Sequence, residues 1–271
     1  MQFIYTYKPL QFFLMTMIGT WIFWFAAAYL SHQKGYEKWQ LLLMVAGLLV
    51  PSIVAVAMIY DSGNSSLIKS FWERLFLYKI GSSSLLIIGV MLLVFFLATA
   101  LSLLFGKSGQ QFALASEFNV MKGWQVLSLV VPLILAPALE ELGWRGYGVD
   151  SLRANFNLFT TSMIFALLWA LWHVPLFFIK GYYQYELWQT NIVYAVNFFI
   201  SIIPVAILTN WIYFKNGRNI LIVIIVHALL NGCAVLFKME QFTKCIVTIL
   251  LCLLSGVLIA YEKDFFLSKL E

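Results

Sequence analysis

Long apolar runs separated by short polar segments dominate the chain. A helix needs about 20 apolar residues to cross the hydrocarbon core of a bilayer. Runs of about this length cover approximately residues 9–30, 39–60, 83–106, 125–150, 158–179, 191–213, 219–237 and 242–261. Their apolar residues are continuous rather than alternating, which favours helices over the strands of a membrane barrel. The pattern predicts an all-α protein, a polytopic membrane bundle of about eight transmembrane helices.

One segment between the second and third runs has a different period. Its apolar residues fall on one helical face: Ile68, Phe71, Trp72, Leu75 and Phe76. Its polar residues fall on the opposite face: Lys69, Ser70, Glu73 and Arg74. This pattern predicts an amphipathic helix that lies on the membrane surface, with a contact against another part of the protein as the alternative.

The composition agrees with a membrane protein. Hydrophobic residues make up 62% of the chain and charged residues 11%, and the mean hydropathy is +0.89. A soluble domain averages about half apolar and a quarter charged residues. The remaining loops are too short for a soluble domain, so we expect a single membrane domain over residues 1–271. The net charge of +5 is spread over loops without a basic run, so we expect no nucleic-acid partner.

Basic residues in the loops bear on the orientation. With eight spans both termini lie on the same side, and ten basic residues collect there: Lys8, Lys69, Arg74, Lys79, Arg145, Arg153, Lys215, Arg218, Lys263 and Lys269. Seven collect on the other side: Lys34, Lys38, Lys107, Lys122, Lys180, Lys238 and Lys244. The positive-inside rule therefore predicts cytoplasmic termini.

Two adjacent acids, Glu140 and Glu141, interrupt the apolar run 125–150. A carboxylate near the middle of a membrane helix costs roughly 2.5–3.5 kcal/mol on insertion scales, so the pair marks a functional site. Glu141 and Arg145 are four residues apart and within reach of an ion pair. Glu140 lies about 140° from Arg145 around the helix and is left free to face a cavity. The alternative is a structural ion-pair cluster between helices.

Three further polar residues, His173, His227 and Asn231, also lie in apolar runs. Counted along their helices, they reach a similar depth in the membrane to Glu140. Glutamate can take a proton from water, and imidazole can orient or share that proton. Imidazole and an asparagine amide can donate hydrogen bonds to an oxyanion. The four residues suffice to hydrolyse an amide with activated water, and they predict an intramembrane catalytic cavity.

Other interpretations of these residues remain open. Glu140, His173 and His227 match the ligand count of a catalytic zinc site, although no His-Glu-x-x-His spacing is present. The aromatic residues Trp169, Trp172 and Phe177 flank His173 and could line a greasy substrate groove or simply pack. A transporter that uses the buried charges as an ion or proton path is a rival function, but no internal repeat supports it. A non-catalytic membrane scaffold is another.

Three motifs resemble those of the CAAX-protease and bacteriocin-processing family, intramembrane proteases that include the Ras-converting CAAX endopeptidases. The motifs are Glu140-Glu141-x-x-x-Arg145, Trp169-x-x-x-His173 and His227-x-x-x-Asn231. They occur in the family's order on successive helices, and the match covers about residues 125–235, the expected catalytic core. One departure is Trp169, where many relatives have Phe, and the aromatic bulk is kept.

The resemblance implies an intramembrane endopeptidase that removes the C-terminal tripeptide from prenylated CAAX proteins, with its cavity open to the cytosol. Its partners would be a prenylated protein or peptide C-terminus and membrane lipid. By position, Glu140 and His173 activate water, and His227 and Asn231 stabilise the oxyanion. Glu141 and Arg145 hold the site in shape. A glutamate-dependent mechanism without a cofactor suits these residues better than zinc, which stays the alternative.

Overall fold

The computed structural model describes residues 5–76, 79–115 and 127–269, and no β-strand lies in this part of the chain. The long helices are α1 (Pro9–Ser31), α2 (Glu37–Asp61), α4 (Ser82–Leu103), α6 (Leu127–Gly143), α8 (Leu158–Trp172), α10 (Ile192–Lys215), α11 (Ile220–Leu236) and α12 (Gln241–Tyr261). The shorter elements are α3 (Ser65–Leu75), η1 (Gly109–Phe112), η3 (Trp144–Gly148), α7 (Val149–Arg153), η4 (Val174–Phe178), α9 (Tyr183–Thr190) and α13 (Lys263–Leu267).

The predicted class, an all-α polytopic membrane bundle, is confirmed. Within the described residues, six helices are long and apolar enough to cross a membrane: α1, α2, α4, α8 together with η4, α10 and α12. The helices α6 and α11 each have 17 residues, which is short for a span. The predicted span 125–150 also begins outside the described residues. The count of eight spans therefore stays a prediction.

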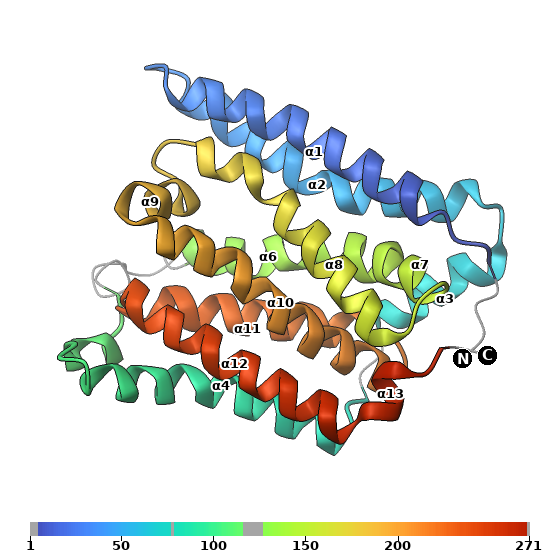
Figure 1. Ribbon diagram of the computed structural model, residues 1–271. Helices are drawn as coiled ribbons and strands as arrows, with labels where there is room; N and C mark the ends of the chain where they lie inside the picture. Colours follow the sequence, from blue (N-terminus) through green and yellow to red (C-terminus); the bar gives the residue numbers. More distant parts are fainter. Residues whose placement is uncertain (1–4, 77–78, 116–126, 270–271) are drawn as a thin grey trace.

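The helices that carry the three motifs lie in the middle of the bundle. In Figure 1, α1 and α2 lie along one edge and α4 and α12 along the other, with α6, α8, α10 and α11 between them. The helix α6 packs between α2 and α11, and α10 contacts both α8 and α12. Both termini lie at one end of the bundle, and α9 lies at the other (Figure 1).

A change of helical pitch follows the two glutamates on α6. Residues Trp144–Gly148 form a π-helical turn before α7 continues the same path. Such turns are rare and occur often at functional sites. Just before this turn, Gly143 contacts α2 so closely that a Cβ atom there would lie 2.5 Å from Cβ of Pro51. A glycine is needed because any side chain would push the two helices apart.

The amphipathic helix expected near residues 67–76 is present as α3, and it packs against the protein. Leu67 and Phe71 are buried, while Trp72 stays exposed. Arg74, which the pattern places on an exposed polar face, is also buried, so that part of the prediction is wrong. The reason is an ion pair of 2.7 Å with the fully buried Asp150, which gives the charge a partner inside the protein.

Candidate active site

The ion pair expected between Glu141 and Arg145 is present. Glu141 is completely buried, and its Oε2 accepts a hydrogen bond from Nη1 of Arg145 at 2.6 Å. The other oxygen, Oε1, accepts a hydrogen bond from Nδ1 of His227 at 2.9 Å. One carboxylate on α6 therefore holds a side chain of α11 in a defined orientation.

The buried guanidinium of Arg145 has further partners on α10. Its Nη2 donates to Oγ1 of Thr209 at 2.7 Å and to Oδ1 of Asn210 at 3.1 Å. It also lies 4.8 Å from the centroid of the Phe165 ring. Both terminal nitrogens of the guanidinium therefore have partners, which lowers the cost of burying its charge. The sequence interpretation missed Thr209 and Asn210, although two adjacent polar residues inside an apolar run are a usable signal.

Glu140 is buried but makes no ion pair within the described residues. It keeps 8% of its surface exposed, whereas Glu141 keeps none. Its Oε2 accepts a hydrogen bond from Nε1 of Trp169 at 3.0 Å. The two adjacent acids thus have different surroundings, as their angular separation on the helix predicts. The sequence interpretation missed the bond from Trp169, which gives this indole a role in orienting the carboxylate.

His173 lies where α8 ends and η4 begins. Its Nδ1 donates to the backbone carbonyl of Trp169, with 2.7 Å between nitrogen and oxygen. A carbonyl oxygen can only accept, so the proton of the neutral ring lies on Nδ1. The Nε2 atom of His173 is therefore left with a lone pair. His227 differs, because its Nδ1 donates to a carboxylate, and its Nε2 can donate only when the ring carries both protons.

A cavity of about 210 Å³ brings several of these residues together. Trp169, His173, His227 and Asn231 all contribute to its wall. Glu140 does not contribute directly; it lies beside the wall, hydrogen-bonded to Trp169. Three of the four predicted catalytic residues therefore share one cavity, and the fourth contacts its lining. The remaining wall comes mainly from α10 and α12.

Comparisons with known proteins agree with this arrangement. A family model described as type II CAAX prenyl endopeptidase Rce1-like matches residues 122–233. The chain is also 38% identical over 268 residues to a CAAX prenyl protease 2 of Methanococcus maripaludis, and the alignment covers 98% of each protein. The chain belongs to the Rce1-like CAAX prenyl endopeptidase family. The resemblance drawn from the three motifs is confirmed, and the chain is an integral, multi-pass membrane protein of a peptidase family.

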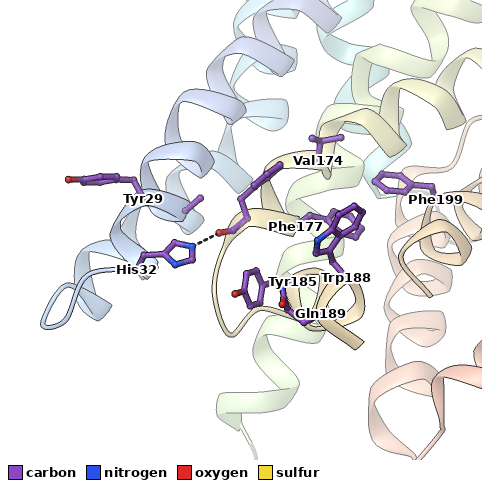
Figure 2. A pocket seen from close by; sticks show the side chains of 10 residues that line it. Tyr29, His32, Val174, Phe177, Tyr185, Trp188, Gln189 and Phe199 are labelled. Carbon is purple, nitrogen blue, oxygen red and sulfur yellow. Dashed lines mark hydrogen bonds between the residues drawn. The ribbon is translucent and has the colours of Figure 1, made fainter. Parts of the chain in front are cut away.

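The aromatic residues expected to form one groove lie in three different places in this member of the Rce1-like family. Trp169 lines the cavity. The indole of Trp172 is buried, where its Nε1 donates to Oγ1 of Thr20 at 2.9 Å. Phe177 lines a second, larger hollow of about 580 Å³ (Figure 2). Neither of these two cavities is lined by all three side chains.

His173 lines the first cavity and is absent from the lining of the second hollow. Val174 and Phe177 of η4 face it, together with Tyr185 and Trp188 of α9 (Figure 2). His32, just beyond α1, closes one side, because its Nε2 donates to the carbonyl of Phe178 at 3.2 Å. The hollow is aromatic and apolar, and it contains none of the motif residues.

The cavity lies towards the end of the bundle opposite to the termini. Its outer wall is made by Tyr183 and Leu187 of α9 and by Gln241 and Lys244 at the start of α12. In Figure 1, α9 lies at one end and both termini lie at the other. The termini and the cavity therefore lie at opposite ends of the bundle, and which end faces the cytoplasm stays a prediction. The charges of the loops bear on the orientation of the chain in the membrane, but they do not show at which end of the bundle a cavity lies.

The zinc alternative requires its ligands to gather around one point. Among the residues that the structure describes, no three His, Cys, Asp or Glu side chains come together as a metal ion would require. Glu140, His173 and His227 do not form such a group. The zinc alternative stays a prediction, and we derive no step through a zinc ion.

Proposed function

We propose that this family member is an intramembrane endopeptidase that removes the C-terminal tripeptide from prenylated CAAX proteins. The observation that carries the proposal is the meeting of His173, His227 and Asn231 at one cavity, with Glu140 held beside them by Trp169. The name of the Methanococcus maripaludis relative supports a prenylated substrate.

In this proposal, Glu140 and His173 activate the attacking water. The carboxylate of Glu140 takes one proton as the water oxygen bonds to the carbonyl carbon of the scissile peptide. The Nε2 lone pair of His173 orients the water, since Nδ1 of that ring is occupied by the carbonyl of Trp169. The proton then passes to the leaving nitrogen of the tripeptide, and the C–N bond breaks. Water is the only co-reactant.

The developing oxyanion would be bound by His227 and Asn231. Both residues lie on one face of α11, four residues apart, and both line the cavity. The side-chain amide of Asn231 does not titrate and can always donate a hydrogen bond. His227 donates from Nε2 while its Nδ1 bonds to Glu141, so the ion pair of Glu141 with Arg145 orients an oxyanion donor. Such preorganised donors are typically worth about 10²–10³ in kcat.

We further propose that the cavity end of the bundle faces the cytoplasm. The ten basic residues that favour cytoplasmic termini include four arginines whose side chains bond inside the protein: Arg74, Arg145, Arg153 and Arg218. Without them, six basic residues remain on the terminal side against seven on the other. An alkaline phosphatase fused after Glu271 should be active outside the cytoplasm, and a cytoplasmic C-terminus in this assay would contradict the orientation.

Purified protein and a farnesylated CAAX peptide test the proposed function. We expect release of the C-terminal tripeptide, detected by mass spectrometry, and no release by Glu140→Gln. The same peptide without the farnesyl group should be a poor substrate. A folded wild-type protein that releases no tripeptide from any prenylated peptide would favour the non-catalytic scaffold instead.

A further inference from the structure

One cation lies in the wall of the cavity, away from the motif residues. Lys244 lies in the first turn of α12. Among the described residues that line the cavity, it is the one with a positively charged side chain of the lysine or arginine type. Its Nζ is 3.3 Å from the hydroxyl of Tyr183 and 4.7 Å from the centroid of that ring. The Tyr183 hydroxyl in turn donates to Oε1 of Gln241 at 3.1 Å. These contacts hold the ammonium group at the outer part of the cavity.

No carboxylate neutralises this ammonium group within the described part of the chain. The nearest acid in sequence, Glu240, pairs instead with Lys107 at 3.0 Å. Two buried cations elsewhere in the protein have anionic partners, since Arg74 pairs with Asp150 and Arg145 with Glu141. A half-buried cation that faces an otherwise mostly apolar cavity without an anion is a suitable partner for an anionic group of a ligand.

The depth of Lys244 matches the length of a tripeptide. On α12, the cavity residues Lys244, Val247, Thr248 and Leu251 recur at helical spacing along one face. On α11, His227 is nine residues before Leu236, about 14 Å from that end of the helix. Lys244 is three residues after Gln241, so about 4.5 Å from the adjacent end of α12. Taking the adjacent ends of α11 and α12 as level, the Cα atoms of the two residues differ in height along the bundle by about 9 Å, and three extended residues reach about 10 Å.

We propose that Lys244 binds the α-carboxylate at the C-terminus of the substrate and thereby fixes cleavage three residues from the chain end. This inference rests on the proposed function, and it names the group of the substrate that sets the register. When the C-terminal carboxylate is bound at Lys244, the three residues of the tail span the distance to His227 and Asn231. The carbonyl of the residue before the tail, which is the scissile carbonyl, then lies at the level of these two side chains. A peptide that continues beyond the third residue has no carboxylate at this distance.

The inference is tested with two farnesylated CAAX peptides that differ only at the C-terminus, one a free acid and one an amide. Wild-type enzyme should cleave the acid with a kcat/KM about 10- to 100-fold above that of the amide, the range expected for one charge-assisted hydrogen bond. Lys244→Met should lower kcat/KM for the acid by the same factor, mainly through KM, and leave the amide unchanged. Lys244→Arg should restore most of the preference.

Lys238→Met is the matched control, because Lys238 is an exposed lysine near the same end and does not line the cavity. It should retain the full preference for the acid. Equal cleavage of acid and amide by the wild-type enzyme, or an equal loss for both peptides in Lys244→Met, would overturn the role of Lys244 alone. If the wild-type enzyme cleaves neither peptide, the proposed function fails, and the inference fails with it.

Discussion

Nδ1 of His227 on α11 donates a hydrogen bond to Oε1 of Glu141 on α6, over 2.9 Å. The same carboxylate pairs with Arg145 through its other oxygen. Glu141 therefore joins the arginine, which bonds to α10, to a histidine that lines the cavity. This relationship separates the tasks of the two neighbouring acids, because Glu140 forms no ion pair with any cation among the described residues.

Glu140→Gln should abolish peptide cleavage and leave the thermal stability near that of wild type. The glutamine side chain has a similar shape, and its carbonyl oxygen can still accept the hydrogen bond from Trp169. It cannot take a proton from water. Activity and melting temperature in detergent measure the two effects, and a fully active Glu140→Gln enzyme would refute its role as the base.

Glu141→Gln should lower both activity and stability. The change leaves the completely buried Arg145 without its anion, and breaking a buried ion pair in this way typically costs about 3–5 kcal/mol. His227 also loses the carboxylate that orients it. Thermal unfolding of Glu141→Gln and Glu140→Gln, measured under the same conditions, compares their stabilities. Equal melting temperatures for the two variants would contradict the assigned division of roles.

Asn231→Ala should lower kcat by roughly 10²–10³ with little change in KM, if its amide donates mainly to the oxyanion of the transition state. Asn231→Asp should also be harmful when the new carboxylate is ionised, since it would repel the oxyanion. Steady-state kinetics with a farnesylated peptide provide the measurement. A rise in KM alone for Asn231→Ala would mean that Asn231 only holds the substrate.

Stringent removal of metal ions should leave most of the activity in place. In the proposed mechanism, Glu140 and His173 activate the water without a metal ion. Dialysis against a chelator, metal analysis of the protein and an activity assay before and after form the test. Stoichiometric zinc whose removal abolishes activity, and whose return restores it, would reverse this assignment.

Gly143→Ala should destabilise the protein and reduce activity. The added methyl group would lie 2.5 Å from Cβ and 2.6 Å from the backbone carbon of Pro51, and backbone atoms cannot move aside cheaply. The result should be a shift of α6 relative to α2, next to the two glutamates. Gly256→Ala in α12 is the control, because no atom lies within 4 Å of its added Cβ. Equal melting temperatures for the two variants would show that the close contact is unimportant.

The spacing of residues within one helix was enough to predict much of the site. Glu141 and Arg145 form their ion pair because residues four apart on a helix are neighbours, whatever surrounds them. The same argument places His227 and Asn231 on one face, and the structure puts both at the cavity. The all-α class follows equally directly from the continuous apolar runs.

Contacts between helices could not be predicted in this way. Nothing in the local pattern indicates that Arg74 reaches Asp150, that Arg145 bonds to Thr209, or that Trp169 bonds to Glu140. Each of these depends on which helices are neighbours and how each is rotated about its axis. Packing across the whole bundle sets both quantities, and small residues such as Gly143 decide how closely two helices approach.

The sequence alone therefore determined the membrane class through its composition and the family through its three motifs, and spacing within single helices predicted which residues we propose to carry the chemistry. The tertiary structure decided that Glu140 lies beside the cavity wall, that the three flanking aromatic residues are separated, and that the cavity lies at the end opposite to the termini. A cavity is the space that several packed helices leave between them, so its position and lining exist only once those helices are assembled.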